Sequence, residues 1–259
     1  MTDVERSVTV VVVVLVGLAA SLLIDPPVFW VVGGLLVILT CVGTDHIVHG
    51  HWRVHLRRKR YTATIWILPG LLVAGAFLFL RLLVFSSRVS PGLAAAFGLS
   101  IVGVLLTAVI IGQYRTLDRD DPSYRPARFA LNLLAYLTAF ALYSAIYSTK
   151  LRSIFSATAI LLVTGLLCLE LFRDTEASIG RTWLYAGTVA LIVGEITWAL
   201  NYWTISPLAA GVFLLLALYL LSGFVQSHLM GQLERNVVVE FSAVALLGFG
   251  LLLASLVRG

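Results

Sequence analysis

Nine apolar stretches follow one another along this chain of 259 residues, and each has about the length that a lipid bilayer requires. A membrane-spanning helix needs roughly 20 predominantly apolar residues, because the hydrocarbon core is about 30 Å thick and a helix rises about 1.5 Å per residue. Turn-forming and charged residues separate the stretches. We therefore predict membrane-spanning helices at about 7–24, 28–43, 63–85, 92–113, 128–148, 153–172, 183–202, 206–225 and 237–257.

The composition requires lipid, rather than water, as the solvent for most of this chain. It is 60% hydrophobic and 12% charged, whereas soluble domains are about 45–50% apolar and about 25% charged. A disulfide scaffold is excluded because both cysteines, Cys41 and Cys168, lie inside apolar runs. We expect an all-α polytopic bundle that forms a single integral membrane domain over residues 1–259.

The first apolar stretch could also be a secretory signal peptide. However, Arg6 is a single basic residue where such a signal usually has several, and the sequence Leu22-Leu23-Ile24-Asp25 lacks the small residues of a cleavage site. We expect a retained helix.

Basic residues predict how the chain is oriented, because Lys and Arg concentrate in cytoplasmic loops. With the N-terminus inside, the inner segments carry thirteen Lys and Arg residues and the outer segments carry four. We therefore predict a cytoplasmic N-terminus, an external C-terminus and a multi-pass protein of the cell (inner) membrane. The densest basic segment, 53–60, fits anionic lipid headgroups better than nucleic acid, so we expect membrane lipids, and no nucleic acid, as partners.

Possible metal ligands cluster at the inner end of the second predicted helix. Asp45 and His49 are four residues apart, and His46 and His49 are three apart, so a helix that continued past residue 43 would bring them to one side. Imidazole and carboxylate are good ligands for zinc, iron or manganese. The cluster resembles the histidine boxes of membrane di-iron enzymes only locally, because those boxes need about eight histidines and this chain has five. Solvated residues in a basic loop remain the simpler interpretation.

Other cofactor classes lack the residues they need. A retinal Schiff base requires a buried lysine, but Lys59 and Lys150 both lie in predicted loops. The sequence has no glycine-rich phosphate loop after a strand, no Gly-x-Ser-x-Gly elbow and no Cys-x-x-Cys pair. We expect no cofactor and no catalytic residues.

A polar and aromatic stripe follows the seventh predicted helix. Tyr185, Thr188, Glu195, Trp198 and Tyr202 are separated by three, seven, three and four residues, which places them on one helical face. A charge at the centre of the bilayer costs at least a few kcal/mol and normally faces protein or water. We therefore expect this face to turn inward.

A second stripe follows the fifth predicted helix, in which Asn132, Tyr136, Tyr143 and Tyr147 repeat at intervals of four, seven and four. The two stripes together predict an aromatic seam inside the bundle. Glu195 could there carry a proton, hold a cation or anchor a lipid headgroup. We expect Glu195, Trp198, Tyr202, Arg81, Tyr143 and Tyr147 to bind the ligand of this seam.

Arg81 is the cation that could pair with Glu195, because both lie toward the outer side of their helices. Arg81 could instead extend to outer headgroups, and Glu195 could simply join helices through hydrogen bonds worth about 0.6–2 kcal/mol. Glu170 and Glu240 lie near the inner surface, where we expect them to reach water.

The stretch from Glu195 to Glu240 includes Tyr202-Trp203, Ser206-Pro207, Gln226, His228 and Arg235. It resembles an uncharacterised family of bacterial polytopic membrane proteins. That resemblance implies a membrane fold and brings no activity or site residue with it.

The function expected from these patterns is non-catalytic. The chain would be a membrane subunit with a membrane protein partner or oligomer, or would bind a small apolar or lipidic ligand in the seam. The alternatives are a transporter of a small solute or proton that uses Glu195, and an intramembrane enzyme that modifies lipids.

Overall fold

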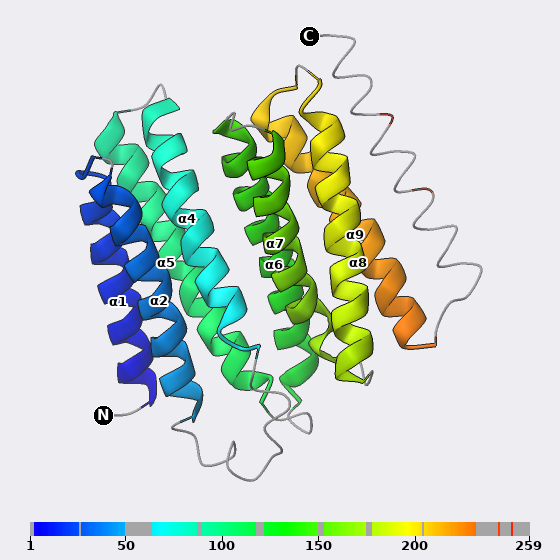
Figure 1. Ribbon diagram of the computed structural model, residues 1–259. Coiled ribbons are helices and arrows are strands. Elements are labelled where there is room, and N and C mark those ends of the chain that lie inside the picture. The colour runs from blue at the N-terminus through cyan, green and yellow to red at the C-terminus, as the bar shows by residue number, and fades with distance from the viewer. Residues whose placement is uncertain are drawn as a thin grey trace. The chain divides into compact units, whose positions relative to one another are not determined.

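The computed structural model describes residues 3–25, 27–49, 64–86, 90–117, 122–149, 153–174, 178–203 and 205–231, together with the single residues 243 and 250. All regular secondary structure in these residues is helical (Figure 1). The α-helices are α1 (Asp3–Ser21), α2 (Val28–His49), α4 (Ile67–Ser86), α5 (Pro91–Arg115), α6 (Tyr124–Ser148), α7 (Ser153–Leu171), α8 (Ile179–Leu200) and α9 (Pro207–Leu229), and a 3₁₀ turn, η1 (Phe172–Asp174), follows α7.

Seven of these helices, α2 and α4 to α9, are long and apolar enough to cross a membrane. The all-α polytopic class is therefore confirmed. The apolar part of α1, Ser7–Ser21, is shorter than a full span. The ninth predicted helix, 237–257, lies outside the described residues except for positions 243 and 250.

Helix ends follow the turn chemistry of the sequence. Pro91 and Pro207 occupy the first turns of α5 and α9, where the missing amide hydrogen of proline removes no helical hydrogen bond. Ser206 caps α9 by accepting a hydrogen bond of 3.4 Å from the backbone amide of Ala209. Gly231, just past the end of α9, has a φ of 67°, which a residue with a β-carbon adopts only at a steric cost.

The chain divides into two compact units, residues 1–138 and 139–259, with the boundary inside α6. Each unit is considered by itself below. The single membrane domain expected over 1–259 stays a prediction.

Unit 1 contains a closed arrangement of four helices, in which α1 packs on α2, α2 on α4, α4 on α5 and α5 on α1 (Figure 1). A glycine lies at each of these interfaces. An added β-carbon would meet the partner side chain closely in every case. These contacts pair Gly17 with Leu36 and Gly43 with Val10 (α1 and α2), Gly33 with Phe77 and Gly70 with Cys41 (α2 and α4), Gly98 with Leu80 (α4 and α5), and Gly103 with Leu15 (α1 and α5).

Unit 2 is built on the antiparallel pair α7 and α8, which make the most extensive contact of the unit. The buried face of α8 carries small residues at intervals of four, namely Ala186, Ala190 and Gly194. A β-carbon on Gly194 would lie 3.2 Å from the β-carbon of Leu161 and 3.6 Å from the carbonyl oxygen of Ala157. Small residues at this spacing let two helix backbones approach closely, which is how helices associate in lipid.

Gly194 therefore should tolerate a large side chain much less well than Gly187, which lies on the same helix with no atom within 4 Å of its β-carbon position. We expect Gly194→Leu to destabilise the protein by about 1–3 kcal/mol through overpacking, and Gly187→Leu to leave stability nearly unchanged. Apparent melting temperatures in detergent, read by size-exclusion fluorescence, check this. Equal melting temperatures for the two variants would contradict the proposed packing.

The predicted orientation has a direct test with two exposed described positions, Asp45 at the end of α2 and Trp203 after α8. In a background without Cys41 and Cys168, an impermeant thiol reagent should label Trp203→Cys in intact cells and Asp45→Cys only after permeabilisation. The opposite pattern would reverse the predicted orientation.

Candidate functional site

Two tyrosines of α6 form hydrogen bonds inside unit 2. The Tyr143 hydroxyl lies 2.7 Å from Oγ1 of Thr164 on α7, and both side chains are fully buried. Thr164 donates its only hydroxyl hydrogen to the carbonyl oxygen of Ile160 at 2.7 Å, so Tyr143 is the donor between the two hydroxyls. Tyr143 thus joins α6 to α7.

Tyr147 joins α6 to the C-terminal end of α8. Its hydroxyl donates to the carbonyl oxygen of Leu200 at 2.9 Å, one of the last-turn carbonyls that have no partner within the helix. Asn201 follows Leu200, and its side-chain amide donates to Oγ of Ser156 at the start of α7 at 2.9 Å. Hydrogen bonds therefore join α6, α7 and α8 at this end of unit 2.

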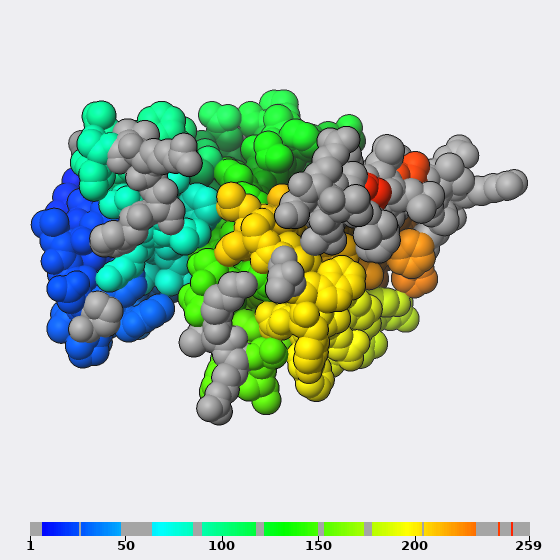
Figure 2. Space-filling model, turned by 90° about the horizontal axis from the view of Figure 1, so that it is seen from above, coloured from blue at the N-terminus to red at the C-terminus, as the bar shows by residue number. Residues whose placement is uncertain are grey.

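Glu195 lies on the opposite face of α8 from these contacts. Glu195, Trp198 and Tyr202 are all exposed on the surface of unit 2, while Val189, Ala190, Val193 and Thr197 are buried. Figure 2 shows the segment where α8 ends and α9 begins, in yellow, on the surface of this end of unit 2.

The expected common seam therefore requires correction. Tyr143 and Tyr147 are core residues, whereas the α8 stripe turns away from that core. The reason is the row of small residues on α8: close backbone approach decides which face packs when lipid surrounds the helices. Whether any of the six predicted residues binds a ligand stays a prediction.

The carboxylate of Glu195 has no hydrogen bond or ion pair with the described residues of unit 2. Two threonine hydroxyls of the same helix do have partners. Thr188 donates to the carbonyl oxygen of Leu184 at 2.9 Å, and Thr197 donates to that of Val193 at 2.8 Å. Glu195 lies five residues before the end of α8, which is about 7.5 Å along the axis at about 1.5 Å per residue. Unlike these two hydroxyls, the Glu195 carboxylate has no partner on its own helix.

Arg81 lies in unit 1 within an aromatic cluster. Its guanidinium carbon lies 4.2 Å from the ring centroid of Phe29, a cation–π contact, and Nη1 donates to the carbonyl oxygen of Ile24 at 3.5 Å. Phe29 in turn stacks on Phe77, with centroids 4.0 Å apart. These contacts hold the side chain at the end of α4 near the α1–α2 turn. The pairing of Arg81 with Glu195 stays a prediction.

The predicted metal ligands extend from the end of α2, which runs past residue 43 as that prediction needed. Asp45 and His46 are exposed. The side chain of His49 lies outside the described residues, as do His51 and His55. Among the side chains that are described, no three His, Cys, Asp or Glu residues are grouped closely enough to hold a metal ion.

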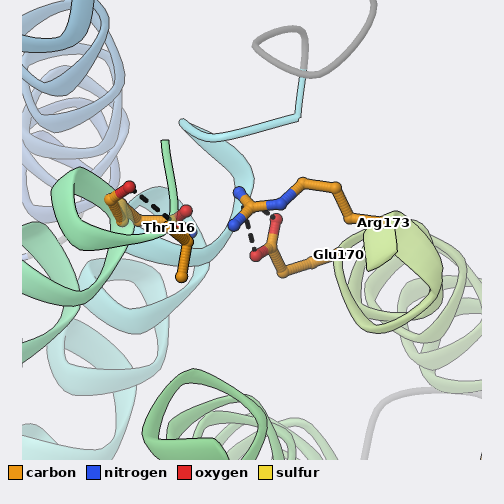
Figure 3. A network of polar contacts seen from close by, with 4 residues as sticks. Thr116, Glu170 and Arg173 are labelled. Carbon is orange, nitrogen blue, oxygen red and sulfur yellow. Dashed lines mark hydrogen bonds and ion pairs between the residues drawn. The ribbon is translucent and has the colours of Figure 1, made fainter. Parts of the chain in front are cut away.

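A polar cluster at the other end of unit 2 was missed by the sequence interpretation. Arg173 binds Glu170 through an ion pair, with Nη1 3.3 Å from Oε1 (Figure 3). Gln226 on α9 donates to the carbonyl oxygen of Leu171 at 3.0 Å, and the rings of Tyr185 and His228 meet edge to face with centroids 5.8 Å apart. The spacing of three between Glu170 and Arg173 was the available signal.

The expectation that Glu170 reaches water is wrong, because only 1% of this residue is exposed. A carboxylate at a helix C-terminus meets the negative end of the helix dipole, so Arg173 is needed to balance it. Glu240, the other acidic residue of that prediction, lies outside the described residues.

Replacing Arg173 alone should therefore lower the stability of the protein more than replacing Arg173 and Glu170 together. We expect Arg173→Gln to destabilise the protein by about 3 kcal/mol, because it removes the cation that lies 3.3 Å from a buried carboxylate. The double variant Arg173→Gln/Glu170→Gln should recover most of that loss. Melting temperatures in detergent check this, with the exposed Arg181→Gln as the control. A double variant no more stable than Arg173→Gln would contradict the assignment.

Comparison with known proteins identifies a family. A family model described as "Protein of unknown function (DUF5656)" matches residues 6–255. No curated protein and no solved structure matches the chain. The match confirms the uncharacterised family that residues 195–240 predicted, and it extends over nearly the whole sequence. The chain therefore belongs to the DUF5656 family of proteins of unknown function.

Proposed function

We propose that the chain is a non-catalytic, multi-pass subunit of a cell (inner) membrane, and that the exposed face of α8 docks another transmembrane protein. The observation that carries this proposal is the position of Glu195, an ionisable group on the surface of unit 2 within a helix long enough to span the membrane.

The energetic argument rests on the environment of that face. A charged side chain directed at lipid costs about 3 kcal/mol at the bilayer centre and less toward the surface, and snorkelling over about 7.5 Å recovers part of the cost for a side chain as short as Glu. A partner that supplies a hydrogen-bond donor removes the cost. Association then gains stability from Glu195 itself.

Aromatic residues flank Glu195 on the same face. Trp198 is 57% exposed and Tyr202 is 77% exposed, and both offer flat apolar area with one polar atom. Side chains of this kind dominate the buried centres of protein interfaces. The α8 face, defined as Glu195, Trp198 and Tyr202, therefore has the composition of a docking surface.

The chemistry of the face also indicates the partner. A second copy docked across a two-fold axis would bring two Glu195 carboxylates together, and like charges at close range in lipid repel. We infer a different transmembrane protein, with a basic or amide side chain at the depth of Glu195. Transport through Glu195 and lipid modification remain alternatives, but no second ionisable group in the described part of unit 2 is paired with it.

A photo-crosslinking amino acid at position 198 tests the proposal in intact membranes, with position 183 as the matched control, because Trp183 is similarly exposed (62%) on the same helix. We expect position 198 to capture one transmembrane protein with a polar or basic residue in its membrane segment. Glu195→Gln should lower that yield about tenfold, since an intramembrane hydrogen bond is worth about 1–2 kcal/mol.

Reciprocal exchange completes the test. Exchanging Glu195 for Lys and the partner's basic residue for Glu should restore the crosslink. Crosslinks from position 198 to lipid alone, or to peptides of this same chain that contain Arg81, would overturn the proposal.

A further inference from the structure

A groove separates α1 from α5 at the end of unit 1 where α1 begins and α5 finishes. Its volume is about 400 Å³, within the range of about 300–1,000 Å³ typical of small-molecule sites. Its walls are branched aliphatic side chains over most of their length. The lining residues are Ser7, Val8, Val11, Val12, Thr107, Ile110, Ile111 and Tyr114.

The groove is closed at its deep end by a tight helix contact. A β-carbon on Gly103 of α5 would lie 2.9 Å from Cδ1 of Leu15 on α1. The two helices therefore touch at this level, and the groove lies where they are further apart, between Leu15 and Ser7. The lining runs from Ser7 to Val12 on α1 and from Thr107 to Tyr114 on α5, which is about 7.5 Å and about 10.5 Å of helix at about 1.5 Å per residue.

These dimensions fit a single acyl chain. One leaflet contributes about half of the hydrocarbon core of about 30 Å, so a groove of about 10 Å covers about two thirds of the depth of one leaflet.

Two of the three hydroxyl groups that line the groove lie at its shallow end. Ser7 and Tyr114 lie there, and the exposed Arg115 follows Tyr114 in the last turn of α5. The one hydroxyl on the deeper wall, that of Thr107, donates to the carbonyl oxygen of Gly103 at 2.7 Å, so its hydrogen is already used. The groove is thus apolar at depth, and one described cation, the exposed Arg115, lies beside its shallow end, where it can meet an anionic headgroup.

We propose that the α1–α5 groove is a binding site for one acyl chain of an anionic phospholipid, whose headgroup lies beside Tyr114 and Arg115. The site is independent of the α8 face, because all its lining residues belong to unit 1.

Native mass spectrometry of the purified full chain, with phosphatidylglycerol or phosphatidylcholine added, tests this site. Val12 lines the groove and is 50% exposed, whereas Val16, one turn along α1, is 64% exposed and does not line it. We expect one tightly held phosphatidylglycerol per chain. Val12→Trp should fill the groove and weaken that binding at least tenfold, and Val16→Trp should leave it unchanged.

A second pair of variants, on α5, tests whether a loss of binding comes from filling the groove or from a folding defect. Ile111→Trp should act like Val12→Trp, and Val104→Trp, at an exposed position outside the groove, should act like wild type. Arg115→Gln should reduce the preference for phosphatidylglycerol over phosphatidylcholine about fivefold, the equivalent of about 1 kcal/mol.

Equal lipid binding by the groove and control variants would overturn the site. So would a wild-type protein that retains no more lipid than Val12→Trp. A preference for phosphatidylglycerol that survives Arg115→Gln unchanged would overturn the assignment of the headgroup.

Discussion

A glycine on one helix against a larger side chain on the next is the contact on which the helix packing of unit 1 depends. Lipid tails are as apolar as leucine, so helices in a bilayer gain little by hiding leucine from lipid. Association instead requires close van der Waals contact, which small residues permit. The four neighbouring helix pairs of unit 1 each contain such a contact, and unit 2 uses alanine and glycine in the same way along α8.

This constraint explains why α8 presents Glu195 outward. A helix can bury only one face against α7, and the face with Ala186, Ala190 and Gly194 gains the closest backbone approach. The polar and aromatic stripe has wider side chains and would hold the helices apart. Hydrogen bonds from Tyr147 and Asn201 then fix the end of α8 without help from the stripe.

The membrane class and seven helices could be predicted from the sequence because both follow from the length and hydropathy of local segments. The sequence predicts less well which face of a helix packs against its neighbours. A polar stripe suggests one face of α8, but in lipid the face with small residues packs. Tyr143 and Tyr147 were correctly placed inside because their hydroxyls find partners on α7 and α8. The groove in unit 1 left no local pattern, because it arises from the distance between two helices that are far apart in sequence.

The contact between Leu15 and Gly103 has a mechanical consequence. Glycine allows close contact between α1 and α2 at two levels, Gly17 with Leu36 and Gly43 with Val10. Between α1 and α5 it does so at one level, Gly103 with Leu15. A larger side chain at position 103 would therefore push α1 away from α5, whereas one at position 17 or 43 would part α1 from α2.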